Sequence, residues 1–231
     1  MILVRRFFSA SVIGPGHVSD GLPNQDYQLH RQAQHCWCAV VCDGMGSRPD
    51  SGIGSREAAK AVWASVKSLP FDVPDKVLVQ TLYQGWLQQL KLLNIGAADA
   101  VTTCLLVWGL PDGRFRYAHL GDGLLASPRG VISECEDERF SNETTGLGIS
   151  RQLSDWRFGV GSLKDYGGCL VLMTDGISED LTDVSAFTAC LAGTLKTKSY
   201  RVGKRWLNRL CNDWPTPGHS DDKTIVVVHC L

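Results

Sequence analysis

Residues 36–47 read Cys-Trp-Cys-Ala-Val-Val-Cys-Asp-Gly-Met-Gly-Ser, an apolar run that ends at Asp43-Gly44. A run that stops at a glycine-containing turn is typical of a buried strand. Asp43 would then lie at the end of the strand, and Gly44 would leave its backbone carbonyl open to close approach by an ion. An Asp-Gly step after a strand usually forms only a turn, so this motif alone does not indicate a site.

The same placement of aspartate beside an apolar run recurs along the chain. Four further examples are Asp26 after Asn24-Gln25, Asp122 after Leu120-Gly121, Asp175 before Gly176, and Asp221-Asp222 before the last apolar run. Because strand ends of one sheet lie near each other, we expect these carboxylates to converge. Converging anions repel one another unless cations compensate them. A cluster of oxygen ligands suits Mg²⁺ or Mn²⁺, and two such ions can activate a water for attack on a phosphoryl group.

The apolar runs and helical periodicities predict a layered α+β domain that extends over residues 1–231. Strands are expected at the start of the chain (Met1–Phe8) and at Cys36–Cys42, Val101–Trp108, Phe115–Leu120, Cys169–Thr174 and Thr224–His229. Helices are expected at Arg56–Lys67, Lys76–Leu93, Ser185–Cys190 and Lys204–Cys211. The turns Leu110–Gly113 and Gly121–Gly123 are predicted to join consecutive antiparallel strands, since Asp-Gly supplies the positive φ that hairpins need.

Composition excludes several classes of protein. Lys and Arg number 23 against 24 Asp and Glu in 231 residues, which does not favour a nucleic-acid or membrane-surface binder. No apolar run approaches the roughly 18–20 residues of a membrane span. The nine cysteines are an odd number without a Cys-x-x-Cys pair, so we expect reduced packing thiols and a cytoplasmic protein.

In order and content, the motifs resemble those of the metal-dependent protein phosphatases, the type 2C or PPM family. The matching segments are Asn24-Gln25-Asp26, Val41–Ser47, Thr102-Thr103, Gly121-Asp122-Gly123, Met173–Gly176 and Ser220–Thr224, which together extend over roughly residues 10–230. Each segment alone is a weak signal, but six in the right order are specific. The resemblance implies an αββα four-layer sandwich, in which two antiparallel sheets are flanked by helix pairs.

The resemblance also implies a set of metal ligands. Asp43 would bridge two Mg²⁺ or Mn²⁺ ions, and the Gly44 carbonyl would bind the second. Asp175 and Asp221 would complete the protein ligands of the first ion. We choose Asp221 because it precedes Asp-Lys-Thr, whereas Asp222 is expected to cap the turn.

Two further carboxylates have roles implied by the family. Asp26 would bind through water or orient the attacking water. Asp122 would hold a weaker third ion together with Asp175.

Other positions depart from the family pattern. Gln25 replaces a frequent glutamate, Met45 stands where some members have a proton-donating histidine, and Gly123 replaces a serine. The arginine that usually precedes the first aspartate is absent, which leaves His17 as the nearest cationic candidate for holding the substrate phosphate.

Several neighbouring residues have less direct predicted roles. Thr102 and Thr103 are expected to pack beside the site, and His119 to be a hydrogen-bonded strand histidine. The loop Ser47–Ser55 is expected to flank the pocket. The acidic stretch Ser133–Gly148 is either a solvated loop or a flap that selects substrates.

Together these features predict a metal-dependent serine/threonine protein phosphatase. Its partner would be a phosphorylated protein, the target of a serine/threonine kinase, although a small phosphorylated metabolite is the other possible substrate. We expect a monomer that binds neither nucleic acid nor membrane. The alternative is a catalytically weak or silent module of the same fold that binds a phosphorylated protein or kinase.

Overall fold

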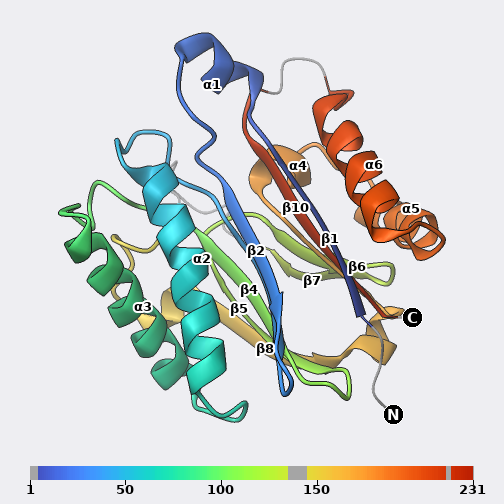
Figure 1. The fold of residues 1–231 in the computed structure, drawn as a ribbon, viewed down its shortest axis with the longest axis horizontal. Coiled ribbons are helices and arrows are strands. Elements are labelled where there is room, and N and C mark those ends of the chain that lie inside the picture. Colours follow the sequence, from blue (N-terminus) through green and yellow to red (C-terminus); the bar gives the residue numbers. More distant parts are fainter. Residues whose placement is uncertain (1–4, 135–144, 217–219, 231) are drawn as a thin grey trace.

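A computed structural model describes residues 5–134, 145–216 and 220–230, and in it two antiparallel sheets stack face to face (Figure 1). The first sheet has five strands in the order β1 (Arg5–Val12), β10 (Lys223–Cys230), β9 (Cys169–Met173), β6 (Leu124–Ser127) and β7 (Gly130–Glu134). The second has five in the order β2 (Tyr27–Gln32), β3 (Trp37–Cys42), β4 (Cys104–Gly109), β5 (Arg114–Leu120) and β8 (Trp156–Ser162).

Helix pairs cover the outer faces of both sheets. Helices α2 (Ser51–Ser68) and α3 (Asp75–Leu92) lie over the second sheet, and α5 (Val184–Lys196) and α6 (Tyr200–Asn212) over the first (Figure 1). The predicted α+β sandwich of four layers is therefore confirmed. Short helical segments complete the described chain: α1 (Pro15–Asp20), α4 (Asp175–Ser178) and two 3₁₀ turns, Leu153–Asp155 and Leu163–Tyr166.

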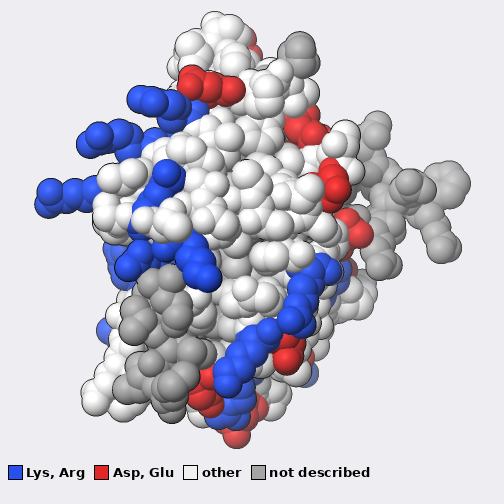
Figure 2. Space-filling view, turned by 90° about the vertical axis from the view of Figure 1, so that its right-hand side faces the viewer, with Lys and Arg blue, Asp and Glu red and all other residues white. Residues whose placement is uncertain are grey.

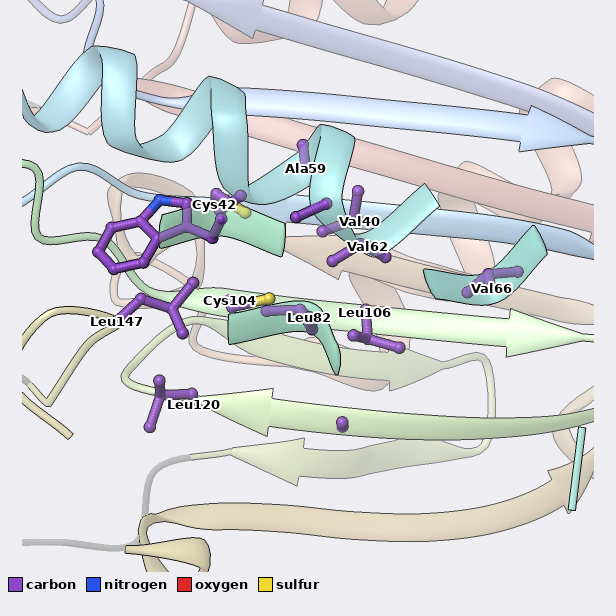
Figure 3. Packing of buried hydrophobic residues seen from close by; sticks show 14 of the residues in the cluster. Val40, Cys42, Ala59, Val62, Val66, Leu82, Cys104, Leu106, Leu120 and Leu147 are labelled. Atoms are coloured by element: carbon purple, nitrogen blue, oxygen red, sulfur yellow. The ribbon is translucent and has the colours of Figure 1, made fainter. Parts of the chain in front are cut away.

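Strand β3 shows why its apolar run is uninterrupted. Its six residues are all buried, because one face packs on helices and the other on the opposite sheet. Val40 and Cys42 join the cluster beneath α2 and α3, where Val62 and Leu82 contact the sheet (Figure 3). Ala39 and Val41 join the cluster between the two sheets. Because side chains alternate along a strand, β3 contributes residues to both hydrophobic clusters.

Of the two predicted hairpin turns, the structure confirms one and contradicts the other. Leu110–Gly113 joins β4 to β5 as an antiparallel hairpin, as predicted. The prediction for Gly121–Gly123 was wrong, because β5 and β6 belong to different sheets. Both glycines have a φ of +88°, so the Asp-Gly signal correctly indicated left-handed backbone. That signal cannot tell a hairpin from a crossover between sheets.

Helix α6 shows how charge is distributed on the outer surface. Gly203, Leu207 and Cys211 are buried, whereas Arg201 and Lys204 are exposed on the same helix. Figure 2 shows the side of the molecule that carries α5 and α6, with one group of Lys and Arg side chains at the left margin and another across the lower part. In the part of the chain that the structure describes, no helix combines the length and hydropathy needed to cross a bilayer.

Candidate metal centre

A cavity of about 640 Å³ opens at the end of the sandwich that carries α1 and α4. Among the described residues, four carboxylates line it, and we call this cavity the acidic pocket: Asp43, Asp122, Asp175 and Asp221. Asp43 follows β3, Asp122 follows β5, Asp175 begins α4 after β9, and Asp221 precedes β10. Strand ends from both sheets therefore meet at one place, although these residues are far apart in sequence.

The carboxylates fall into two adjoining groups. One oxygen from each of Asp43, Asp122 and Asp175 lies within 4.8 Å of the others. Asp221 forms a similar group with His17 and Asp222. The structure thus brings together on one cavity wall six of the seven residues predicted for the site: His17, Asp43, Gly44, Asp122, Asp175 and Asp221.

Asp43 is held through its backbone by two threonines. The Asp43 N–H donates to Oγ1 of Thr103 at 2.9 Å. The Asp43 carbonyl accepts from Oγ1 of Thr102 and from the Thr103 N–H, both at 2.8 Å. All of these bonds use the backbone of Asp43, so its carboxylate remains directed to the pocket wall that it lines. Thr102 and Thr103 are therefore positioning residues.

Gly44 is required by the close approach of neighbouring backbone. A Cβ atom at this position would lie 2.7 Å from the Gln25 carbonyl oxygen and 2.8 Å from the Ser51 backbone. Gly44 also forms an isolated bridge with Thr102. Any larger residue would push the chain after Asp43 away from the loop that carries Gln25.

The Asn24-Gln25-Asp26 segment lies behind the acidic pocket. Asn24 Oδ1 accepts from the Asp26 N–H at 2.8 Å, which fixes the turn into β2. Asp26 is buried and is not among the residues that line the pocket. Its Oδ2 accepts from Thr174 Oγ1 at 2.8 Å, but its buried Oδ1 has no hydrogen-bond partner among the described residues. Only Gln25 of this segment lines the pocket.

Burial and mutual repulsion raise the pKa of three carboxyl groups. For Asp43, burial raises the pKa most, and Asp26 and Asp175 raise it further. Burial likewise raises the pKa of Asp26, against the lowering effect of the Thr174 hydroxyl. The pKa of Asp175 is raised by burial and by Asp221, but lowered by its hydrogen bond with Asp43. The cluster therefore favours either bound protons or bound cations.

His17 lies in the short helix α1 and lines the acidic pocket. Its Nδ1 is 2.9 Å from Oδ2 of Asp222, without the angle of a hydrogen bond. Asp222 itself is buried and accepts from the backbone N–H groups of Gly14 at 2.7 Å and Gln25 at 2.6 Å. Asp222 thus joins the residue before α1 to the loop that carries Gln25, whereas the sequence predicted that it would cap its own turn. In that turn the carboxylate of Asp221 accepts from the Asp222 N–H at 2.7 Å.

His119 and Arg157 hold the loop that carries Asp122. The imidazole of His119 is buried, with Nδ1 2.9 Å from Ser133 Oγ and Nε2 2.9 Å from the Asp122 carbonyl oxygen. Arg157 donates to the carbonyl of Gly121. Burial lowers the pKa of His119 to about 4, so it is neutral near pH 7. The predicted role as a hydrogen-bonded strand histidine agrees with this geometry.

Two predicted segments border the pocket only in part. Ser47 and Arg48 line it, but the chain from Ser51 onward is helical, so the loop predicted over Ser47–Ser55 is only half loop. At the end of the predicted flap Ser133–Gly148, Thr145 and Gly146 line the pocket. Residues 135–144 of that stretch lie outside the described residues, as do residues 1–4 of the predicted first strand.

Arg48 is the functional candidate that the sequence did not indicate. It is the one Lys or Arg side chain among the described residues that line the acidic pocket. Its position in the turn after Gly46 carries no periodic signal that would direct its side chain to the pocket. A search for any cation close in sequence to the Asp43-Gly44 motif would have found it.

Five residues separate Cys42 from Arg48, a spacing that would suit a thiolate nucleophile beside a phosphate-binding arginine. The structure excludes this chemistry, because Cys42 is fully buried. Burial, together with a hydrogen bond to Cys104, raises the pKa of the Cys42 thiol well above its ordinary value. A buried thiol with a raised pKa is not a nucleophile.

The chemistry of the pocket fits hard divalent cations. Its converging ligand atoms are carboxylate and carbonyl oxygens, the donors that Mg²⁺ and Mn²⁺ prefer. Buried oxygens of Asp26 and Gln25 lack hydrogen-bond partners within the described residues, which suits ordered water around a cation. The raised pKa of Asp43 is the expected result when such a cluster lacks compensating charge.

Comparisons with known structures show the same fold at low sequence identity. The S. agalactiae serine/threonine phosphatase has a TM-score of 0.70 and 17% identity, over 98% of this chain and 99% of that one. PppA from Pseudomonas aeruginosa, a regulatory component of T6SS, has a TM-score of 0.66 and 21% identity, over 98% of both chains. The catalytic domain of PstP, solved with two manganese ions, has a TM-score of 0.63 and 17% identity, over 99% of both.

The sequence comparisons address family membership. No curated protein matches the chain. The family profile described as Protein phosphatase 2C matches residues 13–211. That range contains Asp26, Asp43, Asp122 and Asp175, and it covers most of the chain. The chain belongs to the protein phosphatase 2C family.

Proposed function

We propose that this chain is a Mg²⁺- or Mn²⁺-dependent phosphatase that hydrolyses phosphoserine and phosphothreonine in proteins. The observation that carries the proposal is the convergence of Asp43, Asp122 and Asp175, whose oxygens lie within 4.8 Å of one another, beside Asp221 in the same cavity. Structures of similar fold were solved with magnesium or with two manganese ions, which supports the choice of metals.

The proposed ligand roles are those that the resemblance to the family implies for these carboxylates. Asp43 would bridge two ions, with the Gly44 carbonyl on the second and with Asp175 and Asp221 on the first. Asp122 and Asp175 would hold a weaker third ion. When bound, such a pair of cations supplies Lewis acidity, lowers the pKa of water and offsets charge on the phosphoryl group.

The remaining residues of the site would position Asp43, water and the substrate phosphate. Thr102 and Thr103 hold the Asp43 backbone, so its carboxylate needs no rearrangement to bind a cation. Asp26, behind the wall, would act through water, because its Oδ1 has no partner among the described residues. His17 would contact the substrate phosphate from the Asp221 side of the pocket. Met45 offers no proton, so in this proposal no side chain at that position protonates the leaving alkoxide.

A second candidate function is a weak or silent module that binds a phosphorylated protein or kinase. The observation that favours it is the presence of Gln25 and Met45 on the pocket wall, where neither can donate or accept a proton in catalysis. Retention of the buried acidic cluster opposes it, since unneutralised carboxylates that serve no ligand destabilise the fold.

The proposal extends to the setting of the protein. A kinase-phosphorylated protein is the expected substrate, and a single domain acting as a monomer is the expected assembly. We infer a cytoplasmic location because the described cysteines are free thiols, including the adjacent pair Cys42 and Cys104.

Hydrolysis of a chromogenic phosphate ester with added Mn²⁺ tests the proposal. We expect turnover by the natural chain and its loss in Asp43→Asn. Asp213→Asn, which alters an exposed carboxylate at the end of α6, is the matched control and should retain turnover. Equal turnover in the natural chain and Asp43→Asn, or none in any of the three proteins, would contradict the proposed function.

A further inference from the structure

A second cavity adjoins the acidic pocket, and we call it the arginine pocket. Its volume is about 510 Å³, and it lies between the loop Leu22–Gln25 and the segment Gly46–Ile53. Four residues line both cavities: Gln25, Gly46, Ser47 and Arg48. A substrate polypeptide that places its phosphorylated residue in the acidic pocket would therefore have the arginine pocket beside it.

Two guanidinium groups line the arginine pocket. Arg48 is on the wall shared with the acidic pocket, and Arg56 extends from the second turn of α2. Of the described residues on this lining, Asp50 contributes the one carboxylate. The arginine pocket is therefore cationic, whereas its neighbour is strongly anionic.

Arg48 has an anchored backbone and a side chain without an ion-pair partner among the described residues. Its backbone N–H donates to the Met45 carbonyl at 2.9 Å, which closes a turn and anchors the residue. Its side chain forms no ion pair with any described residue, and its buried Nε has no hydrogen-bond partner there. The Arg48 side chain lines both cavities and is therefore not committed to an acceptor within the described protein.

Arg56 has binding capacity left as well. Its Nε donates to Glu57 Oε1 at 3.0 Å, and Glu57 also accepts from Lys60 at 2.8 Å. One carboxylate is thus shared by two cations. Within the described chain, the two terminal nitrogens of Arg56 make no hydrogen bond, and its side chain is 43% exposed.

We propose that the arginine pocket is a specificity subsite for an acidic side chain of the substrate, close in sequence to the phosphorylated residue. Arginine presents a planar fork that matches a carboxylate, and two such groups on one wall favour an anion over a neutral side chain. An extended chain advances about 3.3–3.6 Å per residue, so neighbouring cavities are reached within a few residues. This inference rests on the proposed function for the position of the phosphorylated residue.

Paired phosphothreonine peptides test the subsite. Each pair differs only by Glu or Gln at one position, scanned over about three residues on either side of the phosphothreonine. We expect one position at which Glu raises kcat/KM about fivefold over Gln, through KM. The double variant Arg48→Met, Arg56→Met should reduce that ratio to about one, whereas Arg209→Met, on the exposed face of α6, should retain it.

The outcomes separate this inference from the proposed function. Because the Glu-to-Gln ratio is measured within each protein, a general loss of activity in the double variant does not affect it. If the natural chain hydrolyses no peptide and no chromogenic ester, the proposed function fails. The subsite is then tested by the ratio of the Kd values of the Gln and Glu peptides, measured by fluorescence anisotropy. Equal values for Glu and Gln at every position, or an unchanged ratio in the double variant, would overturn the subsite.

Discussion

Thr174 Oγ1 donates a 2.8 Å hydrogen bond to Oδ2 of Asp26, across a separation of 148 residues in sequence. Thr174 follows β9 of the first sheet, and Asp26 precedes β2 of the second. The bond therefore crosses the sandwich directly behind the acidic pocket. It makes the position of Asp26 depend on how the two sheets are stacked.

Replacement of this hydroxyl should destabilise the protein. In Thr174→Val, Oδ2 of Asp26 loses its donor and the Thr224 N–H loses an acceptor at 3.1 Å. Loss of a partner for a buried polar group costs about 1–3 kcal/mol in the free energy of unfolding. Urea denaturation measures the change. Thr197→Val, whose hydroxyl is exposed, is the control, and equal midpoints for the two variants would contradict the prediction.

The acidic cluster predicts an unusual pH dependence for the protein in a chelator. The pKa values of Asp26, Asp43 and Asp175 are raised in the folded state, mainly by burial. Above the pKa of an unfolded aspartate, near 3.9, the folded state therefore keeps protons that the unfolded state has lost. Stability should fall as pH rises from about 4 through the raised pKa values.

Asp43→Asn tests this predicted fall of stability with rising pH, because it removes one of the carboxyl groups whose ionisation causes it. Without divalent cations, this variant should be more stable than the natural chain near pH 8 by at least about 1 kcal/mol, and its decline with pH should be smaller. Denaturant unfolding at several pH values measures both quantities. A natural chain whose stability rises between about pH 5 and pH 8 in chelator would contradict the assignment of raised pKa values.

Substitution of the adjacent residues Asp221 and Asp222 should have different effects on stability. Asp222→Ala removes the acceptor of two backbone N–H groups, those of Gly14 and Gln25, so the free energy of unfolding should fall by about 2–4 kcal/mol. Asp221→Ala leaves those bonds intact and should change stability in chelator by less than about 1 kcal/mol. The reverse order of the two effects would show that Asp222 is not the residue that joins the loops.

Much of the fold could be predicted because burial leaves a simple pattern. Strand β3 is apolar throughout since both of its faces are covered, and helices α2 and α3 carry apolar residues at helical spacing on the face toward the sheet. The aspartates could be assigned to one site because each lies at a strand end. These signals are local, and tertiary structure did not override them.

The elements that escaped prediction lack such a pattern. Helix α1 has no buried residue, and β6 has only four residues, so neither shows periodicity. The crossover at Gly121–Gly123 has the same sequence signal as a hairpin, and only sheet membership distinguishes them. Arg48 reaches the pocket through a loop, and side-chain direction in a loop is set by packing that sequence does not encode locally.

Binding of Mn²⁺ to the pocket should stabilise the natural chain, because a ligand that binds only the folded state lowers its free energy. At a concentration about one hundred times Kd the gain is about 2.7 kcal/mol, which a thermal melt detects as a higher Tm. Asp43→Asn and Asp175→Asn should lose this shift, whereas Asp213→Asn should keep it, since its carboxylate is exposed at the end of α6. The shift requires no turnover, so it tests metal binding separately from catalysis. An equal shift in Asp43→Asn and in the natural chain would mean that the cation binds elsewhere, and the cluster would then need another explanation for its buried charge.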